Sequence, residues 1–248
     1  MRVVAVIPAR YASTRVPGKA LADLDGRSMI EHVCRRAVAA RSIDAVVVAT
    51  DDARIAQAVE AFGGCVRLTD PSHHTGTDRV AEVVQTLPCE VVVNVQGDEP
   101  LLDPNDIDRV VDALESPNAA PVATLRYALT DPTEFANPHV VKVVVDRRGR
   151  ALYFSRAAIP SGVTTANEPE RPPIYKHIGL YASRREFLLA LAALPRTPLE
   201  IAESLEQIRV LEHGYSIDTV ETPHDSIGVD TPADLELARH QLVTGALP

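Results

Sequence analysis

Short apolar runs alternate with longer amphipathic segments through the first half of the chain. The apolar runs are rich in valine and predict β-strands at residues 3–7, 45–49, 91–95 and 121–125. Between them, apolar residues recur with helical spacing and predict helices at about 28–40, 52–62, 79–87 and 105–115. Because strands that alternate with helices form βαβ units, this half predicts an α/β fold, a mainly parallel sheet with helices on both faces.

The pattern changes after residue 126. Two apolar runs, 140–145 and 151–154, flank the polar turn at 147–149 and predict an antiparallel hairpin. Residues 161–173 are rich in Pro, Thr, Glu and Gly and predict a mobile loop. The other expected elements are a strand at 178–181, helices at about 185–193 and 199–213, a strand near Ile217 and a last helix from about 232.

The length and composition fit one domain. A chain of 248 residues, 46% hydrophobic and 24% charged, is able to bury a full core. We interpret residues 1–248 as a single domain with a smaller subdomain inserted at about 127–183. The predicted hairpin lies in that insert, which we expect to act as a lid or as a dimerisation element.

Charge and hydrophobicity argue against several classes of protein. The formal net charge of -9 argues against nucleic acid as the main partner. The first apolar run is too short for a signal peptide and no run approaches membrane-spanning length, so we expect a cytoplasmic protein without membrane insertion. The cysteines Cys34, Cys65 and Cys89 are scattered in apolar contexts, and we expect buried free thiols.

A cationic loop follows the first predicted strand. Arg10, Arg15 and Lys19 lie within ten residues of one another in a negatively charged chain. Ligands of open α/β sheets bind at the carboxyl edge of the strands, and there Arg offers phosphate a bidentate contact and Lys a point charge. The loop therefore suits a polyanion such as a triphosphate. Gly18 is its only glycine, so it is not a Walker P-loop, and a solvated surface loop is the alternative.

Carboxylates follow another predicted strand at the same expected edge. The run 91–95 leads directly into Gln-Gly-Asp-Glu-Pro at 96–100. Mg²⁺ prefers carboxylate oxygens together with phosphate oxygens and waters, which makes Asp98 a candidate ligand. Asp230 adds a second carboxylate just before the last predicted helix. The alternatives are a strand-ending turn after Gln96 and a helix N-cap near Thr231.

The stretch at 73–79 lies between strands and opens a helix. Its small residues let a flat base approach the backbone, and Arg79 is able to meet a base carbonyl or a phosphate. A plain capped loop is the alternative.

Taken together, these stretches resemble the CMP-Kdo synthetases, the cytidylyltransferases that activate 3-deoxy-manno-octulosonate (Kdo). The similarity runs from residue 3 to about 240. It matches the family's CTP-binding loop at 8–19, its base-recognition loop at 73–79, its metal motif at 94–100 and its second metal-binding stretch at 228–232. Segments similar to those that hold the sugar acid lie at 153–156, 176–181 and 205–209.

The resemblance implies a Rossmann-like nucleotidyltransferase fold and a homodimer. It also implies a reaction in which CTP and Mg²⁺ bind, an oxygen of a small acidic acceptor attacks the α-phosphorus, and pyrophosphate leaves. The implied catalytic residues are Arg10, Arg15, Lys19 and Asp98, and the implied metal ligands are Asp98 and Asp230. The implied CTP-binding residues are Pro8, Ala9, Arg10, Lys19, Thr75, Gly76, Arg79, Gln96 and Asp98. The implied acceptor-binding residues are Arg15, Gln96, Arg156, His177, Tyr181, Glu206 and Gln207, with Arg156 facing the acceptor carboxylate.

Two departures from the family pattern lie on the acceptor side. Residues 161–165 are Ser-Gly-Val-Thr-Thr where the family usually has a Trp followed by an Arg-Asp pair, and Ser183 stands where it often has Tyr. Kdo is the acceptor that the resemblance favours. The alternatives are a small phosphonate such as phosphonoformate, or an inactive nucleotide-binding homologue.

Overall fold

The structure is a computed structural model that describes residues 2–12, 16–73, 75–161, 173–226 and 228–244. Within these residues nine strands form one sheet, ordered β11-β7-β10-β6-β1-β4-β5, with β8 paired to β10 and β9 paired to β8. The strands are β1 Val3–Ala9, β4 Ala45–Thr50, β5 Val66–Leu68, β6 Val91–Asn94, β7 Val122–Ala128, β8 Lys142–Val145, β9 Ala151–Ser155, β10 Tyr175–Arg184 and β11 Ile217–Thr222. A separate small sheet pairs β2 Asp23–Leu24 with β3 Arg27–Ser28, just after a 3-10 helix at Lys19–Leu21.

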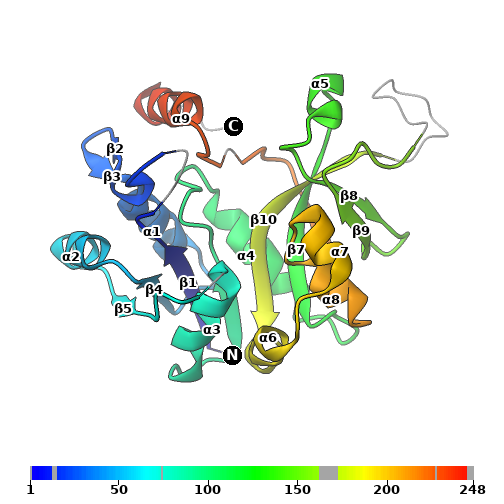
Figure 1. Cartoon of the computed structure of the whole chain (residues 1–248), viewed down its shortest axis with the longest axis horizontal. Helices are drawn as coiled ribbons and strands as arrows, with labels where there is room; N and C mark the ends of the chain where they lie inside the picture. Colours follow the sequence, from blue (N-terminus) through cyan, green and yellow to red (C-terminus); the bar gives the residue numbers. More distant parts are fainter. Residues whose placement is uncertain (1, 13–15, 74, 162–172, 227, 245–248) are drawn as a thin grey trace.

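The helices follow the predicted alternation with the strands (Figure 1). They are α1 Met29–Ala39, α2 Ala53–Ala61, α3 Gly76–Gln85, α4 Pro104–Ala113, α5 Pro132–Ala136, α6 Arg185–Ala193, α7 Pro198–Glu203, α8 Ile208–Glu212 and α9 Pro232–Thr244. In Figure 1, β1, β4 and β5 lie to the left with α1 and α2, and the hairpin lies to the right with α7 and α8.

The predicted parallel core with covered faces is confirmed. Strand β1 pairs in parallel with β4 and β6, and β11 pairs in parallel with β7. Side chains alternate along β1, as a buried strand requires. Val3, Ala5 and Ile7 join one core cluster with α1 and α4, whereas Val4 and Val6 join another with α3 and α6. Helices therefore cover both faces of the sheet.

Strand β10 interrupts the parallel order near the middle of the sheet. It runs antiparallel to both β6 and β7, and it is longer than the predicted strand at 178–181. Its register against β7 shifts between Ile178 and Tyr181, which marks a bulge. This strand joins the parallel core to the second half of the molecule and carries His177 and Tyr181 into that junction.

The prediction of one helix at 199–213 is wrong, because the structure has two helices, α7 and α8. Ser204 ends α7 with a left-handed backbone, φ 55° and ψ 46°. The segment contains neither Gly nor Pro, so the usual helix-stop signals are missing from the sequence. The break leaves Glu206 and Gln207 between the two helices, and this position matters for the site described below.

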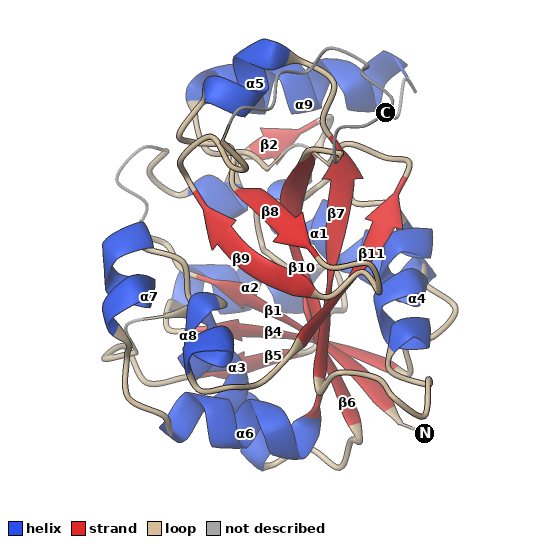
Figure 2. Cartoon of the chain, turned by 90° about the vertical axis from the view of Figure 1, so that its right-hand side faces the viewer, coloured by secondary structure: helices blue, strands red, loops and turns tan. Residues whose placement is uncertain are grey.

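The hairpin is confirmed as β8 and β9, and β8 pairs with β10, so the hairpin extends the main sheet. Figure 2 shows it beside α7 and α8. A distinct subdomain over 127–183, and its use as a lid or dimer element, stay predictions. The predicted loop at 161–173 lies outside the described residues except at its two ends.

The three cysteines are free, as predicted, but they are not all buried. Cys34 is buried, and this burial raises the pKa of its thiol to about 12. Cys65 is exposed and Cys89 is partly buried, which corrects the expectation for both. No helix in the described part of the chain has the length and apolar character needed to cross a membrane.

Candidate active site

A cavity of about 320 Å³ lies where β1 and β6 end and α3 begins, and we call it the nucleotide cavity. Its lining contains every residue that the sequence predicts for CTP. These are Pro8, Ala9, Arg10, Lys19, Thr75, Gly76, Arg79, Gln96 and Asp98. Asp230 lines the same cavity, so residues from the two ends of the chain meet there.

A glycine lets the ends of β1 and β6 come close together. A Cβ atom added to Gly97 would lie 2.8 Å from the carbonyl oxygen of Pro8, closer than a side chain tolerates. The residue between Gln96 and Asp98 is therefore restricted to glycine, and these two polar side chains lie beside Pro8 as a result.

The two predicted metal ligands converge on one cation. The Lys19 ammonium donates to Asp98 Oδ2 at 2.7 Å and to the carbonyl oxygen of Val229 at 2.7 Å, and it lies 3.3 Å from Asp230 Oδ1. The backbone N–H of Val229 also donates to the carbonyl oxygen of Asp98. Two carboxylates that are distant in sequence thus face a single positive charge at the edge of the nucleotide cavity.

The capping alternatives that the sequence left open are also real. Asp234 N–H donates to Thr231 Oγ1 and the Asp234 carboxylate accepts from Thr231 N–H, so Thr231 does cap the last helix. At α3, Thr75 and Asp78 exchange the reciprocal hydrogen bonds of a capping box. The loops that cap these helices also carry site residues. Each cap therefore helps to fix the position of the site residue beside it.

Arg79 is nearly fully buried, and its guanidinium already has protein partners. It donates to Asp51 Oδ2 at 2.8 Å and to the hydroxyl of Thr69. It therefore lines the nucleotide cavity as part of a fixed ion pair. Arg10, in contrast, has an exposed side chain at the cavity mouth.

A second cavity, of about 290 Å³, lies beside β10, α6 and the α7–α8 break, and we call it the acceptor cavity. Five of the seven predicted acceptor residues line it: Gln96, His177, Tyr181, Glu206 and Gln207. Ser183, the departure noted in the sequence, lines it too, while Phe187 and Leu191 of α6 supply an apolar wall.

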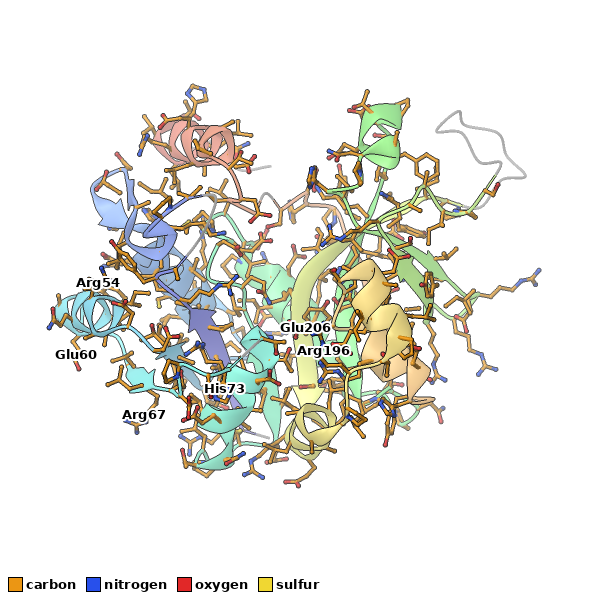
Figure 3. The ribbon with its side chains drawn as sticks, in the orientation of Figure 1. Arg54, Glu60, Arg67, His73, Arg196 and Glu206 are labelled. Atoms are coloured by element: carbon orange, nitrogen blue, oxygen red, sulfur yellow. The ribbon has the colours of Figure 1, made fainter. Side chains whose placement is uncertain are left out.

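The two cavities are neighbours that share part of their lining. Gly76, Gln96 and Glu206 line both of them. Figure 3 shows Glu206 near the middle of the molecule, between α3 and the α7–α8 segment. Burial raises the pKa of Glu206 and nearby Asp78 raises it further, although a hydrogen bond with Thr77 opposes the rise. A carboxyl group with a raised pKa at the point where two compartments meet is typical of a functional site.

Two neutral ring side chains, His177 and Tyr181, line the acceptor cavity. The His177 ring lies 5.0 Å from the Phe154 ring and 5.5 Å from the Tyr181 ring, measured between centroids. Burial lowers the pKa of His177 to about 3, so its imidazole is neutral near pH 7. Burial also raises the pKa of the Tyr181 phenol.

The two predicted acceptor arginines are not placed in this cavity. Arg15 lies outside the described residues. Arg156 is not among the described residues that line the cavity, and its guanidinium donates to the carbonyl oxygens of Glu203 and Pro138. The structure thus gives Arg156 a role in holding the end of α7, and its predicted contact with the acceptor carboxylate stays a prediction.

Four polar residues of the acceptor cavity were not predicted as site residues: Thr77, Asn94, Ser204 and Arg209. Three of them lie within segments that the sequence did single out. Thr77 lies inside the 73–79 motif and Asn94 ends an apolar strand at the carboxyl edge. Arg209 ends the matched segment 205–209, but its buried pairing with Glu200, at 2.6 and 2.8 Å, appears only in the folded chain.

Comparison with known proteins agrees with this geometry. A family model described as cytidylyltransferase matches residues 4–218. The chain belongs to the cytidylyltransferase family. Two curated members are the 3-deoxy-manno-octulosonate cytidylyltransferases of Geobacter sulfurreducens, 51% identical over 98% of this chain and 100% of that protein, and of Syntrophotalea carbinolica, 52% identical over 95% and 96%.

A solved family structure has the same fold throughout. It is a CMP:2-keto-3-deoxy-manno-octonic acid synthetase complexed with CTP, 43% identical, with a TM-score of 0.92 over 99% of this chain and 100% of that one. The family and the α/β fold expected from the sequence are both confirmed.

Proposed function

We propose that this protein transfers CMP from CTP to Kdo, forming CMP-Kdo and pyrophosphate. The observation that carries the proposal is the shared lining of the two cavities. The residues predicted for CTP line one, most of those predicted for the sugar acid line the other, and Gln96 and Glu206 line both. The two curated relatives, 51% and 52% identical in sequence, are named for this activity and support the choice of Kdo.

In the proposed reaction an acceptor oxygen attacks the α-phosphorus, the bond from that phosphorus to the β-phosphate oxygen breaks, and pyrophosphate leaves. Lys19, Arg10 and the N-terminal amides of α3 border the nucleotide cavity, where they bind and neutralise the triphosphate. Gln96 and Glu206 orient the acceptor at the junction. The predicted role of Arg15 is part of this proposal.

We also propose that Asp98 and Asp230 hold Mg²⁺. The fit rests on their chemistry and placement, since both offer hard oxygen donors and both already face the Lys19 ammonium, at 2.7 and 3.3 Å. Among the described residues no group of three His, Cys, Asp or Glu side chains is arranged to hold a metal, which fits a Mg²⁺ site that is completed by phosphate and water. When bound, the ion would neutralise charge on the triphosphate.

The decisive measurement is pyrophosphate release with CTP and Mg²⁺, run in parallel with Kdo and with phosphonoformate. We expect turnover with Kdo. Turnover with phosphonoformate alone would refute the choice of acceptor and would link the 161–165 and Ser183 departures to a changed pocket. CTP binding without turnover of either acceptor would favour the inactive homologue. The named relatives lend no support to a phosphonate acceptor.

The metal proposal has its own test. Asp98→Asn keeps the size of the side chain and removes its charge, and we expect turnover at saturating Mg²⁺ to fall by about 100-fold or more, as when a transition-state charge contact is lost. The matched control is Asp131→Asn, because Asp131 caps α5 and lines neither cavity, and asparagine also caps. If Asp98→Asn turned over like the control, Asp98 would not be a ligand.

We further propose that the protein is a cytoplasmic homodimer. Exposed apolar side chains on β9 and α7, namely Leu152, Leu199 and Ile201, support an interface on that side. The run 140–145, suggested by the sequence, is less suitable because Lys142 and Val143 are buried within the chain itself. Light scattering at micromolar concentration should give twice the chain mass, and a monomer would refute the dimer.

A further inference from the structure

The bulge in β10 is filled by a threonine of the neighbouring strand. One step along β7, from Leu125 to Thr124, is matched by three steps along β10, from Ile178 to Tyr181. Thr124 is fully buried opposite this bulge. Its hydroxyl oxygen lies 2.8 Å from the carbonyl oxygen of Leu180, 3.2 Å from that of Ile178 and 3.0 Å from His177 Nε2.

The three contacts fix where the hydrogens lie. A threonine hydroxyl has one hydrogen and two lone pairs, and a carbonyl oxygen only accepts. The Thr124 hydrogen therefore goes to the carbonyls, of which Leu180 is the nearer. The remaining contact is a hydrogen bond only if His177 Nε2 carries a hydrogen and donates it to Thr124. Because burial keeps this imidazole neutral, Nδ1 then carries the lone pair.

The imidazole of His177 borders the acceptor cavity. His177 lines that cavity and keeps part of its surface exposed. Over the part of the chain that the structure describes, Thr124 is the one hydrogen-bond partner of the ring, and Nδ1 is not among the buried polar atoms that lack a partner. The Phe154 and Tyr181 rings both pack against the imidazole.

We propose that Thr124 is a positioning residue that holds His177 in the Nε2–H form, so that Nδ1 accepts a hydrogen bond from a hydroxyl group of the acceptor. The proposal rests on the proposed function, and it narrows the acceptor to a polyhydroxy acid. A lone pair in the cavity favours a hydroxyl donor and opposes the oxygens of a carboxylate or an ionised phosphonate, which only accept. Ionised phosphonoformate offers no such donor.

The test compares three variants. Thr124→Val removes the hydroxyl at nearly constant volume, and Thr124→Ser keeps it. Thr219→Val is the matched control, because Thr219 is the buried partner of Thr124 in the parallel register of β11 and β7, and its hydroxyl donates to Gly149, outside both cavities. We expect Thr124→Val to raise KM for Kdo about tenfold and to leave KM for CTP within twofold, because one hydrogen bond to the acceptor is lost. Thr124→Ser and Thr219→Val should stay near the wild type in both constants.

A spectroscopic measurement separates positioning from general damage. In the wild type without substrate, ¹⁵N NMR should show His177 with a protonated Nε2 and an unprotonated Nδ1, and Thr124→Val should show a mixture of the two tautomers. A wild-type spectrum with hydrogen on Nδ1, or equal KM values for Kdo in Thr124→Val and Thr219→Val, would overturn the proposal. Failure of the wild type to use Kdo would refute the proposed function, whereas the spectrum, recorded without substrate, decides the role of Thr124 in either case.

Discussion

The nucleotide cavity and the acceptor cavity share a border but are built in different ways. The nucleotide cavity lies at the carboxyl edge of parallel strands, and each of its loops follows directly from a strand or opens a helix. The acceptor cavity depends on two interruptions of regular structure, the bulge in β10 and the break between α7 and α8. A ligand site built at strand ends is specified by the local sequence. A site built from a bulge and a helix break depends on tertiary packing.

Charge differs between the two compartments as well. The nucleotide cavity contains ionised groups that meet in pairs, such as Lys19 with Asp98 and Arg79 with Asp51. The described lining of the acceptor cavity includes a neutral histidine, a phenol and apolar side chains of α6. Its charged members are Arg209, which is paired with Glu200, and Glu206, which lines both cavities. Neutralisation of a polyanion suits the first, and recognition of hydroxyl groups suits the second. Substitutions outside the three shared residues Gly76, Gln96 and Glu206 should therefore affect one substrate at a time.

The largest effect should come from Lys19→Met, which removes the cation between the two carboxylates. We expect kcat/KM for CTP to fall by about 100-fold or more, since a fixed charge at the proposed triphosphate site is lost, with KM for Kdo within threefold. Lys176→Met is the matched control, because Lys176 also faces two carboxylates, at 2.7 and 3.6 Å, but lines neither cavity. Steady-state kinetics with each substrate varied would measure both. If Lys19→Met raised KM for Kdo as strongly as it lowered kcat/KM for CTP, the assignment of one substrate to each cavity would be wrong.

A stability effect of intermediate size is expected in the acceptor half. Glu200 and Arg209 form a buried pair, with side chains 1% and 5% exposed. Glu200→Gln would leave the Arg209 charge without its partner, and we expect the free energy of unfolding at pH 7 to fall by about 3 kcal/mol. Because Arg209 lines only the acceptor cavity, KM for Kdo should rise while KM for CTP stays constant. Glu236→Gln, at an exposed pair on α9, is the control and should change stability little.

The pH dependence of this pair has a definite sign. Burial alone would raise the pKa of Glu200, but hydrogen bonds from Arg209 and Thr197 outweigh it and hold the pKa below its ordinary value of 4.5. A carboxyl with a lowered pKa contributes stability above its unfolded-state pKa and loses that contribution as the pH falls through the folded-state value. Urea unfolding should therefore show the wild type and Glu200→Gln converging below pH 4.5. A constant difference down to pH 3 would contradict the assignment.

The same contrast explains how much the sequence could predict. The parallel strands and the nucleotide cavity followed from apolar runs and from the polar residues at their ends, such as Asp98, because strand ends of a parallel sheet meet at one edge. The break at Ser204 carried no Gly or Pro, and the contacts of Arg156 with α7 depend on a packing that no local pattern encodes. Family resemblance, rather than periodicity, pointed to Glu206 and Gln207.

The smallest predicted effect is a change in stability at Ser204, where the backbone breaks the helix between α7 and α8. Ser204 adopts φ 55°, a left-handed conformation that costs an L-residue about 1 kcal/mol and costs glycine little. Ser204→Gly should relieve this strain, although the greater freedom of glycine in the unfolded chain offsets part of the gain. We expect a net stabilisation of about 0.5 kcal/mol, or about 1–2 °C in Tm, with KM for Kdo within twofold.

The control and the opposite substitution make this small shift interpretable. Ser116→Gly, in an exposed turn where the backbone is not left-handed, should lower Tm slightly or leave it unchanged. Ser204→Val adds a branched side chain at the left-handed position and should lower both Tm and the affinity for Kdo, because Glu206 and Gln207 follow directly. If calorimetry gave Ser204→Gly a lower Tm than Ser116→Gly, relief of backbone strain would not be the dominant effect. The Ser204 side chain, which lines the acceptor cavity, would then contribute stability of its own.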